Sequence, residues 1–327
     1  MNALTSRRST ALAKLQENEI AASLRRHAEA ARGAYAKNTE RALRADVAVF
    51  TAWCLEAGVQ ALPAPPETVA TFIDAMGTSK APATVRRYIS SVATFHRAAE
   101  VANPCDSLRV KLALKRMHRE NGREQQQAGA ITDRLVVRML TAAGYRLGDL
   151  RNKALLVTAY TTMCRSSEMV GLLHEDVQVD GDGFGTVAIR RSKTDQEGRG
   201  DVAAITPDAM YHLRAWTDKA EIQAGPLFRS VSRHGRVGGA LVPGDVARIF
   251  KRMAKRARLT AAETSGISGH STRVGAAQDM LRYGADMAGA MQAGRWKSPE
   301  MLSRYTRRLN AKRGAVARVA GLREQFS

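Results

Sequence analysis

The sequence predicts two domains of different class: an all-α N-terminal domain, and a mixed α+β C-terminal domain that is mainly helical with a small antiparallel sheet. Three observations predict this. Apolar residues recur at helical spacing in the first third of the chain, the periodicity is lost in the polar stretch 114–132, and alternation replaces it only at 183–206. A chain of 327 residues, 44% of them apolar, can build a core in each domain.

The N-terminal domain is predicted over residues 21–114, after a flexible arm at 1–20. Its first helix has a capping residue at Asn38 and ends at Gly58, and two further helices begin near a proline. The expected helices span 37–58, 66–77 and 81–101.

A linker is predicted over 115–130, where charge, glutamine and glycine replace the apolar pattern. The domain at 131–327 then has two strands around a polar turn, with helices on either side. Ser271 or Thr272 is expected to cap the helix that follows "SGH", and Ser298 and Pro299 to begin the last helix. The expected helices are 132–144, 149–177, 207–223, 243–258, 269–280, 286–293 and 298–309.

The charge balance predicts a polyanionic partner. Lys and Arg number 51 against 31 Asp and Glu, a net charge of +20. Double-stranded DNA is the favoured partner, because phosphate contacts supply most sequence-independent affinity. An anionic membrane is the alternative, but the basic residues are dispersed instead of forming a tail or an amphipathic helix, so no membrane partner is predicted.

Other motifs exclude several classes of function. Cys54, Cys105 and Cys164 are far apart and lack CxxC spacing, which predicts reduced thiols in a cytoplasmic protein. No apolar run could span a bilayer or serve as a signal peptide. Without a metal-ligand cluster or a GxxxxGK[ST] motif, no metal, cofactor or ATP is predicted.

Five motifs of the C-terminal domain bring together residue types that suit phosphoryl transfer. A phosphodiester under attack gains negative charge on its nonbridging oxygens, and fixed guanidinium donors stabilise that charge. In chain order the motifs are CRSSEMVGL with Arg165 and Glu168, RRSKTD with Lys193, SGHSTRVGAA with His270 and Arg273, AGRW with Trp296, and SRYTRRL with Tyr305.

Each motif alone has a structural alternative. Arg165 and Glu168 could be an ordinary helical ion pair, and Lys193 could be a charge that protects a strand edge. Trp296 and Tyr305 could pack in a core. The catalytic interpretation fails only if every one of these structural explanations is true at the same time. The combination of motifs therefore favours catalysis.

The ordered set resembles the catalytic residues of the tyrosine recombinases, the phage integrase family, and is closest to the Cre recombinase branch. The helical first half, followed by Asn103 and Pro104, is similar to the core-binding domain of that family. Two departures stand out. Met163 and Cys164 occupy positions where relatives commonly have glycine and leucine, and Arg190, Arg191 or Arg199 could replace Lys193, since all lie in one hairpin.

The resemblance implies a site-specific recombinase that cuts and rejoins DNA through a 3′-phosphotyrosine. It makes Tyr305 the nucleophile and Lys193 the general acid, with Arg165 and Arg273 holding the phosphate. His270 would accept the tyrosine proton or bind the phosphate. Trp296 would donate to the phosphate, and Glu168 would orient Arg165 or His270.

The resemblance also implies an assembly on DNA. Two protomers would bind an inverted repeat, and two such dimers would form a tetrameric synapse that exchanges strands through a Holliday junction, in the cytoplasm of a bacterium and associated with a phage or plasmid. A C-terminal helix with Val316, Val319 and Leu322 would dock into a neighbouring subunit. Basic helix beginnings are expected to contact DNA grooves through Lys37, Thr39, Arg41, Arg86 and Arg87, although solvated faces also carry such residues.

Two alternatives remain open at the level of sequence. A type IB topoisomerase shares this chemistry but relaxes supercoils without pairing two sites. A noncatalytic DNA-binding regulator on a recombinase scaffold would keep the fold and lose the reaction.

Overall fold

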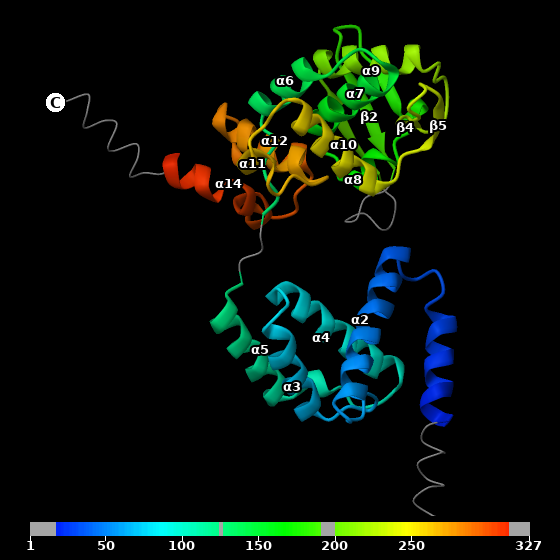
Figure 1. The fold of residues 1–327 in the computed structure, drawn as a ribbon, viewed down its shortest axis with the longest axis vertical. Coiled ribbons are helices and arrows are strands. Elements are labelled where there is room, and N and C mark those ends of the chain that lie inside the picture. Colours follow the sequence, from blue (N-terminus) through cyan, green and yellow to red (C-terminus); the bar gives the residue numbers. More distant parts are fainter. Residues whose placement is uncertain (1–17, 124–126, 191–199, 314–327) are drawn as a thin grey trace, which may run out of the picture. The chain divides into compact units, whose positions relative to one another are not determined.

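The computed structural model describes residues 18–123, 127–190 and 200–313, with side chains up to residue 306 (Figure 1). The chain forms two compact units, Met1–Gln126 and Gln127–Ser327.

The described part of the N-terminal unit is all helical, as predicted. A helix over 18–30 precedes the larger helices. Their core contains Phe50 and Phe72, whose ring centroids lie 5.1 Å apart in an edge-to-face arrangement. The labelled elements are α2 (Lys37–Glu56), α3 (Pro66–Gly77), α4 (Pro82–Ala98), the short η1 (Pro104–Asp106) and α5 (Leu108–Asn121).

The predicted cap at Asn38 is wrong. Helix α2 begins at Lys37 with Ala36 as its N-cap, and the Asn38 side chain accepts a hydrogen bond of 2.6 Å from the Arg41 guanidinium. The carboxamide therefore binds a neighbouring side chain one turn later and leaves the first backbone N–H groups of the helix to other partners.

The predicted boundaries of the arm and the linker also need correction. Residues 18–20 of the expected arm are helical. Helix α5 continues to Asn121, so residues 115–121 of the expected linker are helical as well. The buried face of α5 consists of Val110, Ala113 and Met117, a spacing that carries the helix past residue 114.

The described part of the C-terminal unit is mixed α+β, as predicted. Strands β1, β2 and β3 form an antiparallel sheet in that order, and β2 alternates buried and half-buried residues. The elements are α6 (Asp133–Ala142), α7 (Leu147–Thr161), α8 (Ser166–Met169), η2 (His174–Asp176), β1 (Val177–Val179), β2 (Gly185–Ile189), β3 (Asp201–Ile205), α9 (Pro207–Lys219), β4 (Arg229–Val231), β5 (Val237–Ala240), α10 (Pro243–Arg256), α11 (Ala261–Thr264), α12 (Ser271–Arg282), α13 (Met287–Gly294) and α14 (Pro299–Arg313).

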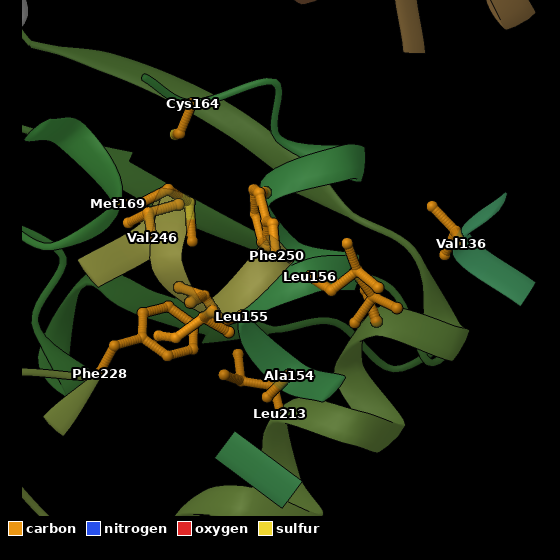
Figure 2. Close-up of a cluster of buried hydrophobic side chains, with 14 of the residues drawn as sticks. Val136, Ala154, Leu155, Leu156, Cys164, Met169, Leu213, Phe228, Val246 and Phe250 are labelled. Atoms are coloured by element: carbon orange, nitrogen blue, oxygen red, sulfur yellow. The ribbon is translucent and has the colours of Figure 1, made fainter. Parts of the chain in front are cut away.

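Helix α7 lies in the core of this unit. Leu155 and Leu156 are fully buried and pack with Phe228 and Phe250 in one cluster (Figure 2). Burial of each such side chain contributes about 1.5–3 kcal/mol to folding. The core therefore gives a rigid support to the loop that follows α7.

The predicted helix over 149–177 is interrupted. Helix α7 ends at Thr161, Met163 adopts a left-handed φ of 52°, and the chain restarts as the short α8. Met163 thus takes a backbone conformation that favours glycine, at the position where the sequence departs from the family pattern. Strand β1 and the β4–β5 hairpin were not predicted, because strands of three or four residues have too few positions for alternation to show.

The segment before α6 lies against α12. The Ile131 backbone N–H donates to Ser271 O at 2.9 Å, and a Cβ on Gly275 would lie 1.8 Å from Ile131 O. The expected cap by Ser271 or Thr272 is wrong, because α12 starts at Ser271 and His270 is its N-cap. The Ser271 hydroxyl instead accepts from the Ser268 backbone N–H at 2.8 Å.

Candidate active site

Arg165 and Glu168 form an ion pair at the start of α8. The Arg165 guanidinium Nη1 lies 2.6 Å from Glu168 Oε1, and the Arg165 backbone N–H donates to Oε2 at 2.9 Å. Burial raises the pKa of Glu168, but the hydrogen bonds from Arg165 outweigh it, so the net pKa is below its ordinary value. The sequence predicted that Glu168 orients either Arg165 or His270, and the ionised Glu168 carboxylate contacts Arg165.

Arg273 is a buried cation in the first turn of α12. Its side chain is 1% exposed and donates to Met163 O at 2.6 Å and to the carbonyl of Gly294. The guanidinium carbon also lies 4.6 Å from the centre of the Trp296 ring, a cation–π contact. Burial, and then the charge of Arg165, lower the pKa of Arg273 to about 10, so the group stays charged at neutral pH.

His270 and Tyr305 are hydrogen-bonded. The Tyr305 hydroxyl lies 2.8 Å from His270 Nε2, and Gln278 donates to the Tyr305 backbone carbonyl at 2.9 Å, which ties α14 to α12. Burial, followed by the charges of Arg273 and Arg165, lowers the pKa of His270 to about 4. The imidazole is therefore neutral at pH 7 and has one nitrogen able to accept a proton.

Trp296 lies between the cation and the phenol. Its ring centroid is 5.5 Å from that of Tyr305, and the residue is 5% exposed. Its indole Nε1 is buried and has no hydrogen-bond partner among the described residues. A buried N–H without a partner costs free energy. An acceptor that enters the site and binds this indole N–H would remove that cost.

Comparison with known proteins identifies the family. The model described as "Phage integrase family" matches residues 123–312, more than half of the chain. The chain belongs to the phage integrase family. This tyrosine recombinase is 31% identical over 281 residues to an integrase/recombinase XerD homolog of Selenomonas ruminantium (83% of this chain, 81% of the relative). It is 29% identical over 311 residues to recombinase Cre of Escherichia phage P1 (88% and 89%).

Solved structures share the fold of the recombinase. One is the Tn1549 transposon integrase in complex with transposon right end DNA (TM-score 0.62, 14% identity, 86% of this chain and 94% of that chain). Another is a lambda integrase dimer bound to a COC′ core site (TM-score 0.58, 15% identity, 87% and 76%). The family and the two curated relatives make this protein a site-specific recombinase, an enzyme that cleaves and rejoins DNA, and they do not favour the topoisomerase or regulator alternatives.

The structure brings most of the predicted catalytic residues of the recombinase into one site. The exception is Lys193, which lies outside the described residues together with Arg191 and Arg199. Arg190 is described, and its Nε donates to Asp176 at 2.6 Å. The site residues come from α8, α12, the turn after α13, and α14: Arg165, Glu168, His270, Arg273, Trp296 and Tyr305.

Two basic helix beginnings of the N-terminal unit are exposed. One of them is partly engaged, because Arg87 Nη1 lies 2.8 Å from the carboxylate of Asp46, whose side chain is 2% exposed. Asp46 also accepts from the Ser91 hydroxyl at 2.9 Å. The exposed residues are Lys37, Thr39, Arg41, Arg86 and Arg87.

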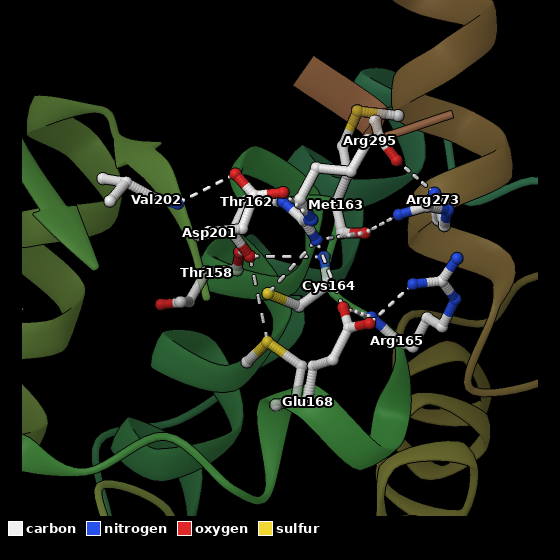
Figure 3. A network of polar contacts seen from close by, with 12 residues as sticks. Thr158, Thr162, Met163, Cys164, Arg165, Glu168, Asp201, Val202, Arg273 and Arg295 are labelled. Atoms are coloured by element: carbon white, nitrogen blue, oxygen red, sulfur yellow. Dashed lines mark hydrogen bonds and ion pairs between the residues drawn. The ribbon is translucent and has the colours of Figure 1, made fainter. Parts of the chain in front are cut away.

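Sequence reasoning missed Arg295, a buried cation of the recombinase site. Its Nη2 lies 3.2 Å from Glu168 Oε2, so a second guanidinium shares the carboxylate that orients Arg165 (Figure 3). The only signal was its position beside Trp296 in AGRW. Within the described ranges, no cluster of side chains could hold a metal ion, and no helix has the length and apolar character needed to cross a bilayer.

Proposed function

We propose that this recombinase cleaves double-stranded DNA with Tyr305 as nucleophile. The phenolic oxygen attacks phosphorus, the bond from phosphorus to the 5′ oxygen breaks, and a 3′-phosphotyrosine remains. Rejoining is the reverse attack by a 5′ hydroxyl, which needs no ATP because the phosphodiester bond energy is kept. The observation that supports this most is the 2.8 Å hydrogen bond between the Tyr305 hydroxyl and His270, beside Arg273 and Trp296.

Arg165 and Arg273 bind the nonbridging oxygens of the scissile phosphate in this proposal. Both guanidiniums are held before DNA arrives, Arg165 by Glu168 and Arg273 by two backbone carbonyls. Fixed donors stabilise the transition state without reorganising, and loss of one such donor costs about 10² to 10³ in rate. The unpaired indole N–H of Trp296 is a third donor to the phosphate.

Proton transfer follows from the state of His270. The imidazole is neutral at pH 7 because its pKa is about 4. In this proposal Nε2, which lies 2.8 Å from the Tyr305 hydroxyl, accepts the phenolic proton as the oxygen attacks. The departing 5′ oxygen needs a proton from a general acid. We assign that role to Lys193 on the family resemblance alone.

The DNA partner is an inverted repeat bound by two protomers, and two bound repeats form a tetrameric synapse with a Holliday junction as intermediate. The net charge of +20 supports a DNA partner. Lys37, Thr39, Arg41, Arg86 and Arg87 are proposed to contact the duplex from the N-terminal unit. The tail segment with Val316, Val319 and Leu322 lies outside the described residues and is proposed to dock into a neighbouring protomer. We place the protein in the bacterial cytoplasm.

The test begins with selection of bound duplexes from random DNA. An inverted repeat flanking a short spacer is expected, and a selected site without symmetry would contradict the paired-protomer arrangement. A nicked suicide duplex with the selected site then traps covalent protein for the parent and for the control Tyr211→Phe, since Tyr211 lies on α9 and is 69% exposed. Tyr305→Phe should bind the duplex and trap none. Covalent trapping by that variant would refute Tyr305 as nucleophile.

A further inference from the structure

Arg295 combines a strained backbone with a buried charge. It follows α13 in the left-handed conformation, with φ 52° and ψ 45°, which is disfavoured for residues other than glycine and asparagine. Its side chain turns into the protein and is 8% exposed. A residue held in this way needs contacts that outweigh both costs.

The guanidinium of Arg295 makes those contacts with the loop after α7 and with α8. Its Nη1 donates to Thr162 O at 3.0 Å, and its Nη2 donates to Glu168 Oε2 at 3.2 Å and to Met163 O at 3.5 Å. Its Nε lies 3.8 Å from a carboxylate oxygen of Asp201. Figure 3 shows Thr162, Met163 and Cys164 beside Arg295, with dashed lines for their polar contacts.

Two of these acceptors also hold the two phosphate-binding arginines. Glu168 binds Arg295 through Oε2 and Arg165 through Oε1, so both carboxylate oxygens have cationic partners. The Met163 carbonyl accepts from Arg295 and, at 2.6 Å, from Arg273. Arg295 is thus one contact away from each of them.

We propose that Arg295 is a positioning residue of this recombinase, which holds Glu168 and the Met163 carbonyl so that Arg165 and Arg273 face the scissile phosphate. The inference rests on the proposed function for the roles of those two arginines. Without Arg295, the Glu168 carboxylate keeps one cation and can rotate about its side chain. The left-handed turn at Met163 also loses the hydrogen bonds that span it.

Three variants separate positioning from backbone strain. Arg295→Gly removes the guanidinium and relaxes the left-handed backbone, and Arg295→Lys keeps the positive charge. Arg258→Gly is the matched control, because Arg258 has a left-handed φ of 51° just after α10, outside the site. All three are measured on the nicked duplex that carries the selected site, for single-turnover cleavage and for DNA affinity.

Arg295→Gly is expected to slow cleavage about 10- to 100-fold while DNA affinity stays near the parent value. Arg295→Lys should recover part of the rate, and Arg258→Gly should cleave like the parent.

The pH profile gives a second readout, because Glu168 must be ionised to hold Arg165. The groups that influence it electrostatically are Arg165 beside it, Arg295 after α13, His270 and Arg273 on α12 and the Cys164 thiol. Loss of the Arg295 charge raises the pKa of the carboxyl. In the glycine variant, cleavage should therefore begin to fall at a higher pH than the fall near pH 4 expected from His270 in the parent, and the lysine variant should return toward the parent.

Two outcomes would overturn the inference. One is cleavage by Arg295→Gly as fast as by Arg258→Gly. The other is an equal slowing at every pH that lysine does not relieve, which would mean a purely structural role. Tyr305→Phe is assayed in parallel: covalent trapping by that variant would overturn the proposed function, whereas the Arg295 results bear on the positioning role alone.

Discussion

Gly275 is the position where one added methyl group should disturb α12, the helix that contains Arg273. A Cβ there would lie 1.8 Å from Ile131 O and 2.3 Å from Ile131 C, both backbone atoms. Non-bonded carbon atoms pack at about 3.5–4.0 Å. Gly275→Ala therefore forces α12 and the segment before α6 apart by about 1 Å or more. Neither side can yield by a simple side-chain rotation.

The expected loss of stability is the sum of three effects. Overpacking costs about 1–3 kcal/mol, and loss of the hydrogen bond from the Ile131 N–H to Ser271 O costs about 1 kcal/mol. Alanine in a helix returns about 1 kcal/mol relative to glycine. The net prediction for Gly275→Ala is a decrease of about 1–3 kcal/mol in the free energy of unfolding.

The assay is denaturant unfolding of Gly275→Ala beside a matched control, Gly244→Ala in α10, where an added Cβ meets nothing within 4 Å. The control should be as stable as the parent or slightly more stable. Since α12 contains Arg273 and begins directly after His270, the Gly275 variant should also trap covalent protein more slowly. An unfolding midpoint of Gly275→Ala equal to that of the control would refute the close approach on which this reasoning depends.

Three further predictions concern the site and the N-terminal unit. Because the pKa of His270 is near 4, its proton-accepting role should show in the pH profile of single-turnover cleavage as a fall near pH 4, and an inflection near 6.5 that disappears in His270→Gln would contradict the prediction. Trp296→Phe keeps an aromatic ring but loses the unpaired N–H, so cleavage should fall about 10²- to 10³-fold, and a parental single-turnover rate would exclude the indole as a phosphate donor. Arg86→Ala should reduce the salt dependence of DNA binding by about one phosphate contact without changing stability. Arg87→Ala should in addition lower the free energy of unfolding by about 1 kcal/mol, since it leaves Asp46 buried without its cation, and equal stability of the two variants in denaturant would argue against that ion pair.

The reaction class was predictable from sequence because five motifs of the C-terminal domain resemble, in type and order, those of one enzyme family. A tyrosine, two arginines, a histidine and a tryptophan in this order resemble the catalytic set of the tyrosine recombinases, and that resemblance implies phosphoryl transfer. Most helices were equally predictable, since the apolar stripe of a helix such as α2 repeats within a single segment. The polar stretch 114–132 marked the division into two units, although α5 runs seven residues past its expected end at residue 114.

Tertiary structure alone decided how those residues meet. The chain takes left-handed turns at Met163, after α7, and at Arg295, after α13, and neither residue type announces such a turn in sequence. The second cation on Glu168 comes from a residue 127 positions away, a contact that local pattern cannot show. The sequence by itself indicated most helices, through short-range periodicity, and the reaction class, through the resemblance of its motifs to one family. The structure decided which charges share a partner, because buried ion pairs form between segments that are distant along the chain and are stable only in the geometry the fold imposes.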